Sequence, residues 1–281
     1  MKGMAGVLVL ALLLAVPAAA QWPPYPTRGV PRTPAGEPDL NGPPPRVADG
    51  KPDLSGIWEN LGWDQLSSGV GGAGGAPGTN PAALTRPFGP ALFFDIGSGV
   101  EGGLPLQPWA AELKKARMAA HSKDNPDAHC LPMGNMQFHT HPQPRKIIQT
   151  PDVIVILYEA NGGLRQIFTD GRPLPDNDPQ PWWYGYSVGR WEGDTLVVET
   201  RHFRDGGWLD VNGSPLTDAA RMIERFRRPS YGTLELEITV DDPKAYTRPW
   251  TVRFTQRALV DTELIEFVCL ENEKSTRYFD K

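Results

Sequence analysis

"RMIERFRRPSYGTLELEITV", residues 221–240, is the stretch that decides the fold class of this 281-residue chain. In its second half, apolar residues at every second position from Leu234 to Val240 alternate with Glu235, Glu237 and Thr239. Successive side chains of a strand point to opposite faces, so this strand has one apolar face and one face in water. The turn "PSYG" joins it to the strand "RMIERFRR". The stretch therefore predicts an antiparallel hairpin.

Short strands recur at regular intervals along the chain, which is typical of an antiparallel meander. The other predicted strands are "DLSGIWEN" (53–60), "KIIQT" (146–150), "VIVILYE" (153–159), "LRQIFTDG" (164–171), "WWYGYSVGRW" (182–191), "DTLVVETRHF" (194–203), "WTVRFTQRAL" (250–259) and "TELIEFVCL" (262–270). About nine or ten strands exceed what a small open sheet usually carries, and closing the sheet removes its exposed edges. The sequence predicts a mainly β protein whose meander closes into a β-barrel, with a two-sheet β-sandwich as the alternative.

One short helix is expected within residues 106–126, "LQPWAAELKKARMAAHSKDNP". Pro108 suits the first helical position, and helix formers rich in alanine follow it. The helix should end near Lys123, before the helix-breaking "DNP". We expect it to belong to an inserted loop and helix, residues 61–145, within a single barrel domain that spans residues 53–281.

The N-terminus has the layout of a secretory signal peptide. Residues 1–20 contain Lys2, an apolar run and an A-x-A site, so we expect cleavage after Ala20. Residues 21–52 should form a Pro-rich disordered leader, and the glycine-dense residues 67–90 a flexible loop. No later apolar run approaches the roughly twenty residues that cross a bilayer. These features predict a periplasmic or secreted protein with no integral membrane segment.

The net charge indicates which partners to expect, and the cysteines indicate a disulfide. A formal net charge of −5 without basic blocks gives no electrostatic reason to bind nucleic acid. Cys130 and Cys269 are the two cysteines, and export to an oxidising compartment favours a disulfide between them. Two buried free thiols are the alternative. The expected partner is a small molecule, and the oligomeric state stays open.

Several segments of the chain resemble a large family of secreted bacterial proteins. They include "PDLSGIW", "GRWEGDTLVVET", "DDPKAYTRPW" and "CLENEK", and the likeness extends from Pro52 to Lys274. This resemblance implies no activity. A second resemblance, carried by Gly56, Ile57 and Trp58, is to lipocalin-like barrels. It implies that Trp58 plugs one end of an up-and-down barrel whose other end opens to an apolar ligand.

Five aromatic residues crowd into residues 182–191. Aromatic side chains on a strand can line a ligand pocket or stack on a sugar ring at the mouth of a barrel. In the alternative interpretation, half of them face the core and the others pack beneath loops. The predicted ligand-binding residues are Trp182, Trp183, Tyr184, Tyr186, Trp191 and Arg165.

Acidic residues on or beside the strands could supply a general acid and a general base, if two of them face inward. The catalytic candidates are Glu199, Glu224 and Asp194. Glu199 is the first to test, because its face of the strand is partly apolar. Arginines such as Arg165 and Arg225 are distributed in the same way, so structural ion pairs are the alternative.

The segment "HCLPMGNMQFHTHPQP", residues 129–144, holds three of the five histidines. On a strand, His139 and His141 would project to the same face and could bind one divalent metal, with His129 or His202 as a third ligand. The alternative is a polar loop with exposed histidines, because prolines follow directly. No cofactor is otherwise expected, since the G-x-S-x-G, Walker A and H-E-x-x-H motifs are absent from the sequence.

These observations leave three functional hypotheses. The first is an exported barrel that binds a small apolar or aromatic ligand. The second is an extracytoplasmic enzyme of the hydrolase or lyase type, which acts on a carbohydrate or an aromatic small molecule through carboxylates or a His-bound metal. The third is a cell-surface interaction module that attaches through its Pro-rich leader.

Overall fold

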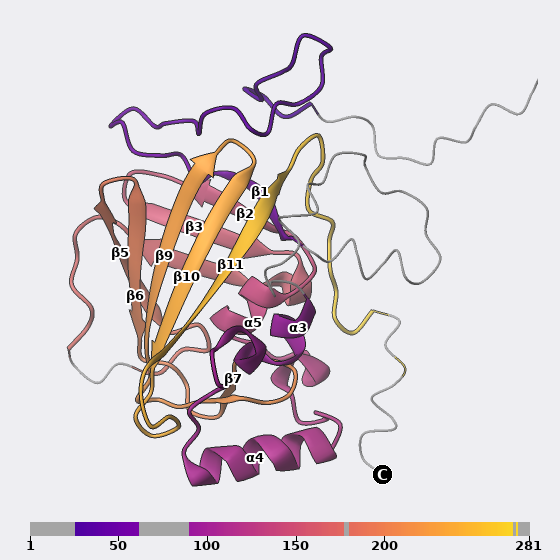
Figure 1. Ribbon diagram of the computed structural model, residues 1–281, viewed down its shortest axis with the longest axis vertical. Coiled ribbons are helices and arrows are strands. Elements are labelled where there is room, and N and C mark those ends of the chain that lie inside the picture. The colour runs from indigo at the N-terminus through magenta and orange to yellow at the C-terminus, as the bar shows by residue number, and fades with distance from the viewer. Residues whose placement is uncertain (1–25, 62–89, 177–179, 272–273, 275–281) are drawn as a thin grey trace, which may run out of the picture.

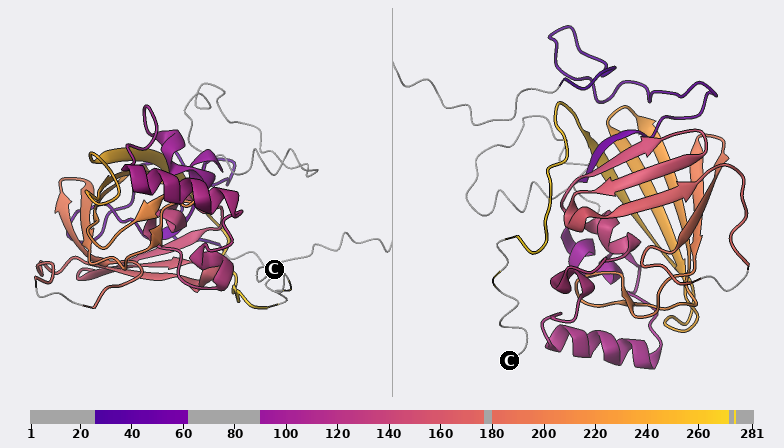
Figure 2. Two further views of the ribbon diagram at one scale, coloured as in Figure 1. Left: turned by 90° about the horizontal axis from the view of Figure 1, so that it is seen from below. Right: turned by 180° about the vertical axis from the view of Figure 1, so that it is seen from behind.

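Nine strands form a closed barrel, with helices at one end and an N-terminal segment across the other (Figures 1 and 2). This computed structural model describes residues 26–61, 90–176, 180–271 and 274. The barrel strands, in their order around the ring, are β1 (Gly56–Asn60), β11 (Trp250–Leu259), β10 (Thr233–Asp241), β9 (Arg221–Ser230), β6 (Thr195–Arg201), β5 (Tyr186–Glu192), β4 (Leu164–Phe168), β3 (Val153–Tyr158) and β2 (Arg145–Gln149). The predicted lipocalin-like barrel is confirmed, and the sandwich alternative is wrong.

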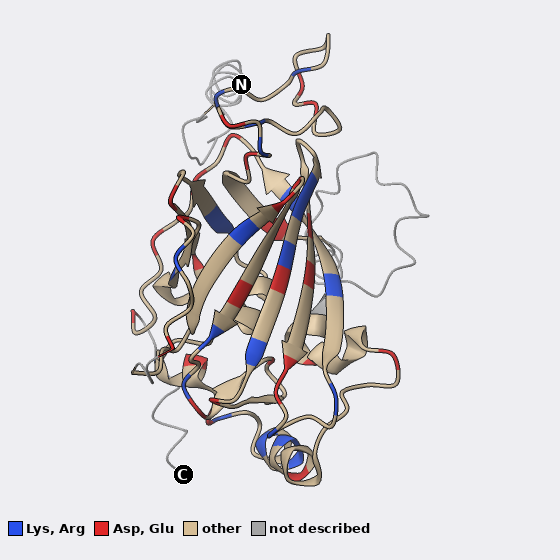
Figure 3. Ribbon diagram, turned by 90° about the vertical axis from the view of Figure 1, so that its left-hand side faces the viewer, with Lys and Arg blue, Asp and Glu red and all other residues tan. Residues whose placement is uncertain are grey.

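The hairpin of β9 and β10 shows how the sequence pattern builds the barrel. Leu236 lies opposite Phe226, and both side chains are buried in the interior. Glu235 lies opposite Arg227 on the outer face, where the two side chains form an ion pair of 3.0 Å. Figure 3 shows acidic and basic residues along the same neighbouring strands. The two-residue period therefore separates an apolar interior from a charged exterior.

Strand β1 closes the ring, because it pairs with both β11 and β2. Its Trp58 is fully buried and donates a hydrogen bond from Nε1 to the carbonyl oxygen of Leu54 (3.0 Å). Gly56 precedes it with a φ of +143°, a conformation that side chains rarely adopt. The glycine thus lets the chain turn into the strand while the indole packs inside the barrel.

The junction between β4 and β5 differs from every other junction in the ring. It is parallel, and only Ile167 with Ser187 and Phe168 with Val188 are paired there. All other neighbouring barrel strands are antiparallel. We call this junction the β4–β5 seam. Beyond those two pairs, toward Leu164 on one side and Tyr184 on the other, no strand pairing among the described residues joins the two sides of the wall.

The inserted segment contains α3 (Pro90–Phe94), α4 (Pro108–Ala119) and α5 (Asn135–Thr140), with the 3-10 turns η2 (Ile96–Gly99) and η3 (Pro126–His129). The predicted helix is α4. It starts at Pro108 but stops before Lys123, because His121 and Ser122 both have positive φ angles. Helix α5 occupies sequence that we expected to be a strand or loop. No described helix is long and apolar enough to cross a membrane.

Three short elements complete the described part of the chain. They are the 3-10 turn η4 (Ala160–Gly162) and a small two-stranded sheet of β7 (Gly207–Trp208) and β8 (Pro215–Leu216). The predicted signal peptide, residues 21–25 and residues 67–89 of the expected flexible loop lie outside the described residues.

Residues 26–52, which we expected to be part of a disordered leader, lie across the end of the barrel opposite the helices (Figure 1). Arg46 forms an ion pair of 2.8 Å with Asp194 at the turn between β5 and β6. Elsewhere in this segment, the carbonyl oxygen of Leu40 accepts a hydrogen bond from the backbone N–H of Gly232 (2.8 Å). Polar contacts with the barrel therefore hold the segment in place. Its low apolar content, from which disorder was predicted, does not report such contacts.

The predicted disulfide between Cys130 and Cys269 is present, with a Cα–Cα distance of 5.7 Å. It closes a loop with a sequence separation of 139 residues, which stabilises the fold by about 4 to 5 kcal/mol in the chain-entropy model. The predicted last strand, residues 262–270, does not form. Because β11 already pairs with β10 and β1, no barrel edge is left for this segment to join. The disulfide instead fixes a C-terminal segment that follows the last strand.

Candidate ligand-binding site

A cavity of about 430 Å³ lies beside the β4–β5 seam. Its walls come from β4, the start of β5, Pro132 and residues 182–185, which precede β5 in the chain. The residues of this aromatic pocket are Pro132, Leu164, Arg165, Gln166, Phe168, Trp182, Trp183, Tyr184, Gly185, Tyr186 and Ser187. The cavity therefore occupies the place where two neighbouring strands have separated.

A turn that ends at a glycine brings two adjacent tryptophans to the same pocket. Gly185 has a φ of +66°, and a Cβ atom there would lie 2.6 Å from Cγ2 of Thr200. The turn before it closes with a hydrogen bond of 3.3 Å from the Gly185 N–H to the carbonyl oxygen of Trp182. Adjacent residues of a regular strand point to opposite faces, but this turn brings Trp182 and Trp183 to one pocket.

The aromatic rings pack against one another from the rim to the core. At the rim, the Trp182 and Tyr186 ring centroids are 5.4 Å apart, and Tyr186 stacks on Phe168 at 5.2 Å. On the inner side, the Tyr184 ring lies 5.5 Å from that of Phe138 in α5. Burial raises the pKa of Tyr184 to about 12, so its hydroxyl is neutral and offers both a donor and an acceptor.

Two arginines hold aromatic rings of the pocket from outside. The Arg172 guanidinium lies 3.9 Å from the Phe168 ring centroid and donates to the Tyr186 hydroxyl (3.3 Å). The Arg204 guanidinium lies 4.9 Å from the ring centroid of Trp183. Cation–π contacts of this kind are worth about 0.5–1 kcal/mol at exposed sites. They favour a pocket whose walls are in place before a ligand arrives.

Five of the six predicted ligand-binding residues meet in this pocket, and one does not. Trp191, at the far end of β5, is half-buried and packs against the hydrophobic core instead. Its register in β5 explains this, because it lies five residues beyond Tyr186, away from the seam. The prediction missed Leu164 and Phe168, although they belong to the same predicted strand as Arg165. The parallel pairing of β4 with β5 brings them to the pocket, and no signal in the sequence indicates that pairing.

The floor of the pocket is polar and buried. Arg165 and Ser187 both line the cavity, yet each is at most 2% exposed. Arg165 donates from Nη2 to the hydroxyl oxygens of Ser187 and Thr200, both at 3.0 Å. It also donates from Nη1 to Oε1 of Glu224 at 2.8 Å, and from Nη2 to Oε2 of the same carboxylate. We call Arg165, Glu224, His139, Ser187 and Thr200 the buried polar cluster.

Glu224 is the centre of this cluster and is ionised. Burial alone would raise its pKa, but the charge and hydrogen bonds of Arg165 and a hydrogen bond from His139 outweigh burial and lower the pKa to about 2. His139 Nε2 lies 2.8 Å from Glu224 Oε1. Burial lowers the pKa of His139, so the imidazole is neutral and donates its Nε2 proton to the carboxylate. The Glu224 carboxylate and the His139 imidazole are therefore hydrogen-bonded to each other.

The other two catalytic candidates face away from the interior. Glu199 forms ion pairs with Arg221 (2.7 Å) and Arg201 (2.8 Å), which lower its pKa to about 2. Asp194 pairs with Arg46 in a turn and is exposed. Val198 and Thr200 point inward while Glu199 points outward, on the face that it shares with the apolar, buried Val197. Glu224 is thus the one candidate carboxylate in the interior, and structural ion pairing describes all three.

The histidines of the H-x-H pair do not lie on a strand. His139 is in α5 and reaches Glu224, whereas His141 follows the helix and packs edge-on against Phe93 (4.9 Å). His129 forms a hydrogen bond of 2.8 Å with the carbonyl oxygen of Lys123, and His202 forms one with that of Pro175. Across the described residues, no group of three or more His, Cys, Asp or Glu side chains could hold a metal ion.

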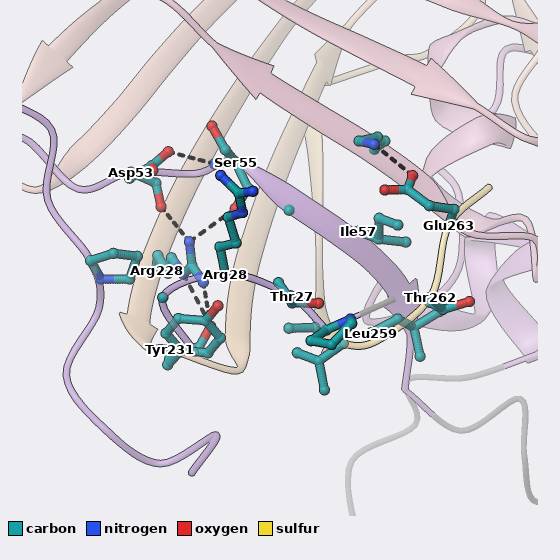
Figure 4. Close-up of a pocket in the computed structure, with 17 residues that line it drawn as sticks. Thr27, Arg28, Asp53, Ser55, Ile57, Arg228, Tyr231, Leu259, Thr262 and Glu263 are labelled. Atoms are coloured by element: carbon teal, nitrogen blue, oxygen red, sulfur yellow. Dashed lines mark hydrogen bonds and ion pairs between the residues drawn. The ribbon is translucent and has the colours of Figure 1, made fainter. Parts of the chain in front are cut away.

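A second cavity, of about 560 Å³, lies at the end of the barrel that residues 26–52 cross. Figure 4 shows its lining residues, among them Arg28, Arg228 and Glu263. No sequence pattern indicated this cavity, because its walls come from segments far apart in the chain. We call it the leader cavity.

No protein-family model matches this chain, and no curated protein matches it either. Its function is therefore inferred from the geometry of the two cavities and of the buried polar cluster.

Proposed function

We propose that this protein binds a small aromatic molecule in the aromatic pocket beside the β4–β5 seam. The observation that carries this proposal is a cavity of about 430 Å³ walled by Phe168, Trp182, Trp183, Tyr184 and Tyr186. Pockets for small ligands range over roughly 300–1,000 Å³ and combine apolar or aromatic walls with a few polar groups. The buried Ser187 and Arg165 supply those polar groups at the floor.

The geometry supports binding better than catalysis. An inward carboxylate that acts as a general acid needs a raised pKa, whereas the pKa of Glu224 is lowered to about 2. Its two oxygens are occupied by Arg165 and His139, and its side chain is fully buried. Glycosidase chemistry also needs a second inward carboxylate, and Glu199 faces outward. The three candidate carboxylates therefore do not include an inward-facing pair, which the enzyme hypothesis needs.

Titration with neutral aromatic compounds such as indole and p-cresol tests the proposal. We expect saturable binding by calorimetry, with a change in tryptophan fluorescence. Replacing Trp183 with alanine removes a wall of the pocket and should weaken binding about tenfold, because one aromatic contact and its buried area are lost. Trp109→Ala is the matched control, since Trp109 is also partly exposed but lies in α4, outside the pocket.

Three results of this titration would contradict the proposal. The first is the absence of saturable binding for all the aromatic compounds. The second is equal weakening by Trp183→Ala and Trp109→Ala. The third is chemical conversion of the bound compound, which would instead favour the enzyme hypothesis.

We also propose that the chain is exported and that residues 1–20 are removed. The disulfide between Cys130 and Cys269 supports export, because such bonds persist in oxidising compartments. The layout of the first twenty residues supports cleavage after Ala20. Mass spectrometry of the protein from the expressing cell should give a mature chain that begins at Gln21. An intact N-terminus in the cytoplasmic fraction would refute this part.

A further inference from the structure

The leader cavity is built from segments that are far apart in the chain and meet at one end of the barrel. Residues 26–29 form one wall, and they are held by two reciprocal hydrogen bonds. The Thr27 N–H donates to Oδ1 of Asp261 (2.8 Å), and the Asp261 N–H donates to Oγ1 of Thr27 (2.7 Å). The other walls are Pro45, the start of β1, Lys146 of β2, the end of β9 with the turn after it, and the end of β11 with the chain after it. The cavity is therefore a fixed part of the fold.

One arginine in this cavity is buried without a carboxylate partner among the described residues. Arg228 is 4% exposed, and its guanidinium lies over the rings of Trp58 and Tyr231 at 4.8 and 4.9 Å. It donates to the backbone carbonyl oxygens of Asp53, Ser55 and Tyr231. These bonds use four of its five N–H donors. Burial lowers its pKa to about 10, so the group is still a cation at neutral pH.

A second arginine lines the same cavity. Arg28 comes from residues 26–29, and in Figure 4 it lies at the same end of the cavity as Arg228 and Ser55. Arg28 is exposed, and within the described ranges its guanidinium forms no hydrogen bond or ion pair. Among the described residues, its donors are therefore left for solvent or a ligand.

The acidic residues of the cavity are already engaged. Glu263 pairs with Lys146 at 2.6 Å, at the other end of the cavity in Figure 4. Oδ1 of Asp53 accepts the backbone N–H of Ser55 (2.8 Å). The cavity thus holds two guanidinium groups that no carboxylate of the described residues binds directly. The charge of Asp53 acts on Arg228 without a direct hydrogen bond to its guanidinium, and it raises the pKa of Arg228 against the larger lowering by burial.

We propose that the leader cavity binds a small organic carboxylate, separately from the aromatic pocket. Its carboxylate would lie between Arg28 and the remaining donor of Arg228, since guanidinium groups match carboxylates in charge and planar geometry. The apolar part of the ligand would pack on Ile57, Ala258 and Leu259, which line the same cavity. The cavity volume of about 560 Å³ falls within the range of pockets that bind small molecules.

Calorimetric titration of the full chain with octanoate, octan-1-ol and inorganic phosphate tests this site. Octanoate and octan-1-ol have the same chain length, so their difference reports the charged group. We expect octanoate to bind about tenfold more tightly than the alcohol, and Arg28→Gln to remove most of that preference. Arg190→Gln is the matched control, because Arg190 is an exposed arginine of β5 away from the cavity.

Each outcome decides the proposal. Equal affinity for the acid and the alcohol, or unchanged octanoate binding in Arg28→Gln, would overturn it. Binding of phosphate without binding of octanoate would overturn the assignment to an organic ligand. Trp183→Ala should leave octanoate binding unchanged while weakening the aromatic compounds, so the failure of one site is distinguishable from the failure of the other.

Discussion

Two glutamates on neighbouring strands each pair with an arginine, but on opposite sides of the barrel wall. Glu199 on β6 faces outward and pairs with Arg221, while Glu224 on β9 faces inward and pairs with Arg165. The register places Glu199 opposite Ile223 and Glu224 opposite Val198, so the pairs are neighbours in the sheet. Both carboxyl groups have a pKa lowered to about 2.

The same pKa has a different energetic meaning in the two places. The side chains of the inner pair are at most 1% exposed, so neither charge can recover its hydration if its partner is lost. In the outer pair Glu199 is 15% and Arg221 is 42% exposed, so water screens both charges. Breaking a buried pair typically costs about 3–5 kcal/mol, whereas exposed pairs contribute about 0–1 kcal/mol. Burial, and not the ion-pair geometry, decides what each pair contributes.

Glu224→Leu is the change with the largest expected effect. It leaves the Arg165 guanidinium buried without its carboxylate, and it removes the acceptor of the His139 hydrogen bond. We expect a loss of about 3–5 kcal/mol in the free energy of unfolding, measured by urea denaturation.

Combining Glu224→Leu with Arg165→Met is the control for that change. The double variant removes both charges, and apolar replacement of a whole buried pair is often neutral or stabilising. It should therefore regain most of the stability lost in the single variant. Equal instability of the single and double variants would show that the cost comes from packing and not from an unpaired charge.

Acid should destabilise the inner pair next most strongly. Because the folded pKa of Glu224 is about 2 and its ordinary value is 4.5, its contribution is complete above pH 4.5 and is lost as the pH falls toward 2. That shift corresponds to about 3 kcal/mol. His139, whose pKa burial lowers below 6.5, adds a loss that starts below pH 6.5. Unfolding measured from pH 7 to pH 2 should show a smaller acid loss in the double variant than in the native protein.

Glu199→Gln tests the outer pair, and we expect a much smaller effect. Glutamine keeps the size of the side chain and removes its charge, while Arg201 and Arg221 stay solvated on the surface. The free energy of unfolding should fall by at most about 1 kcal/mol. A loss as large as that of Glu224→Leu would contradict the assignment of the energetic difference to burial.

Salt should give the smallest effect and should separate the two pairs. At about 1 M ionic strength the screening length is about 3 Å, which weakens attraction between exposed charges. The coupling energy of Glu199 with Arg221, from a double-mutant cycle, should fall toward zero. The coupling energy of Glu224 with Arg165 should not change, because salt does not reach a buried pair.

Alternation was sufficient to predict the barrel. In "RMIERFRR" and "TLELEITV" the apolar residues specify which face is buried, and Glu224 falls on that face. The alternation in "DTLVVET" is weaker, since Val197 and Val198 are both buried and adjacent. The sequence left open which side Glu199 faces, and the alternative of structural ion pairs described it correctly.

The features that the sequence did not reveal depend on contacts between distant segments. His139 and Glu224 are 85 residues apart, and the strand assumed for the H-x-H pair is a helix whose residues are all buried. The crowding of aromatics at residues 182–191 did predict most of one pocket wall. The parallel β4–β5 seam, which supplies the opposite wall, has no local sequence signal.

Strand β1 also constrains the order in which the barrel can be completed. It is the first barrel strand to be synthesised, and its partners are β2 at residues 145–149 and β11 at residues 250–259. The loop that the disulfide closes begins at Cys130, so it contains β2 to β11 but excludes β1. Strand β1 can pair with β2 once residue 149 has been synthesised, but its second partner, β11, follows about a hundred residues later. A chain truncated before residue 250 lacks β11 and therefore cannot close the ring on β1.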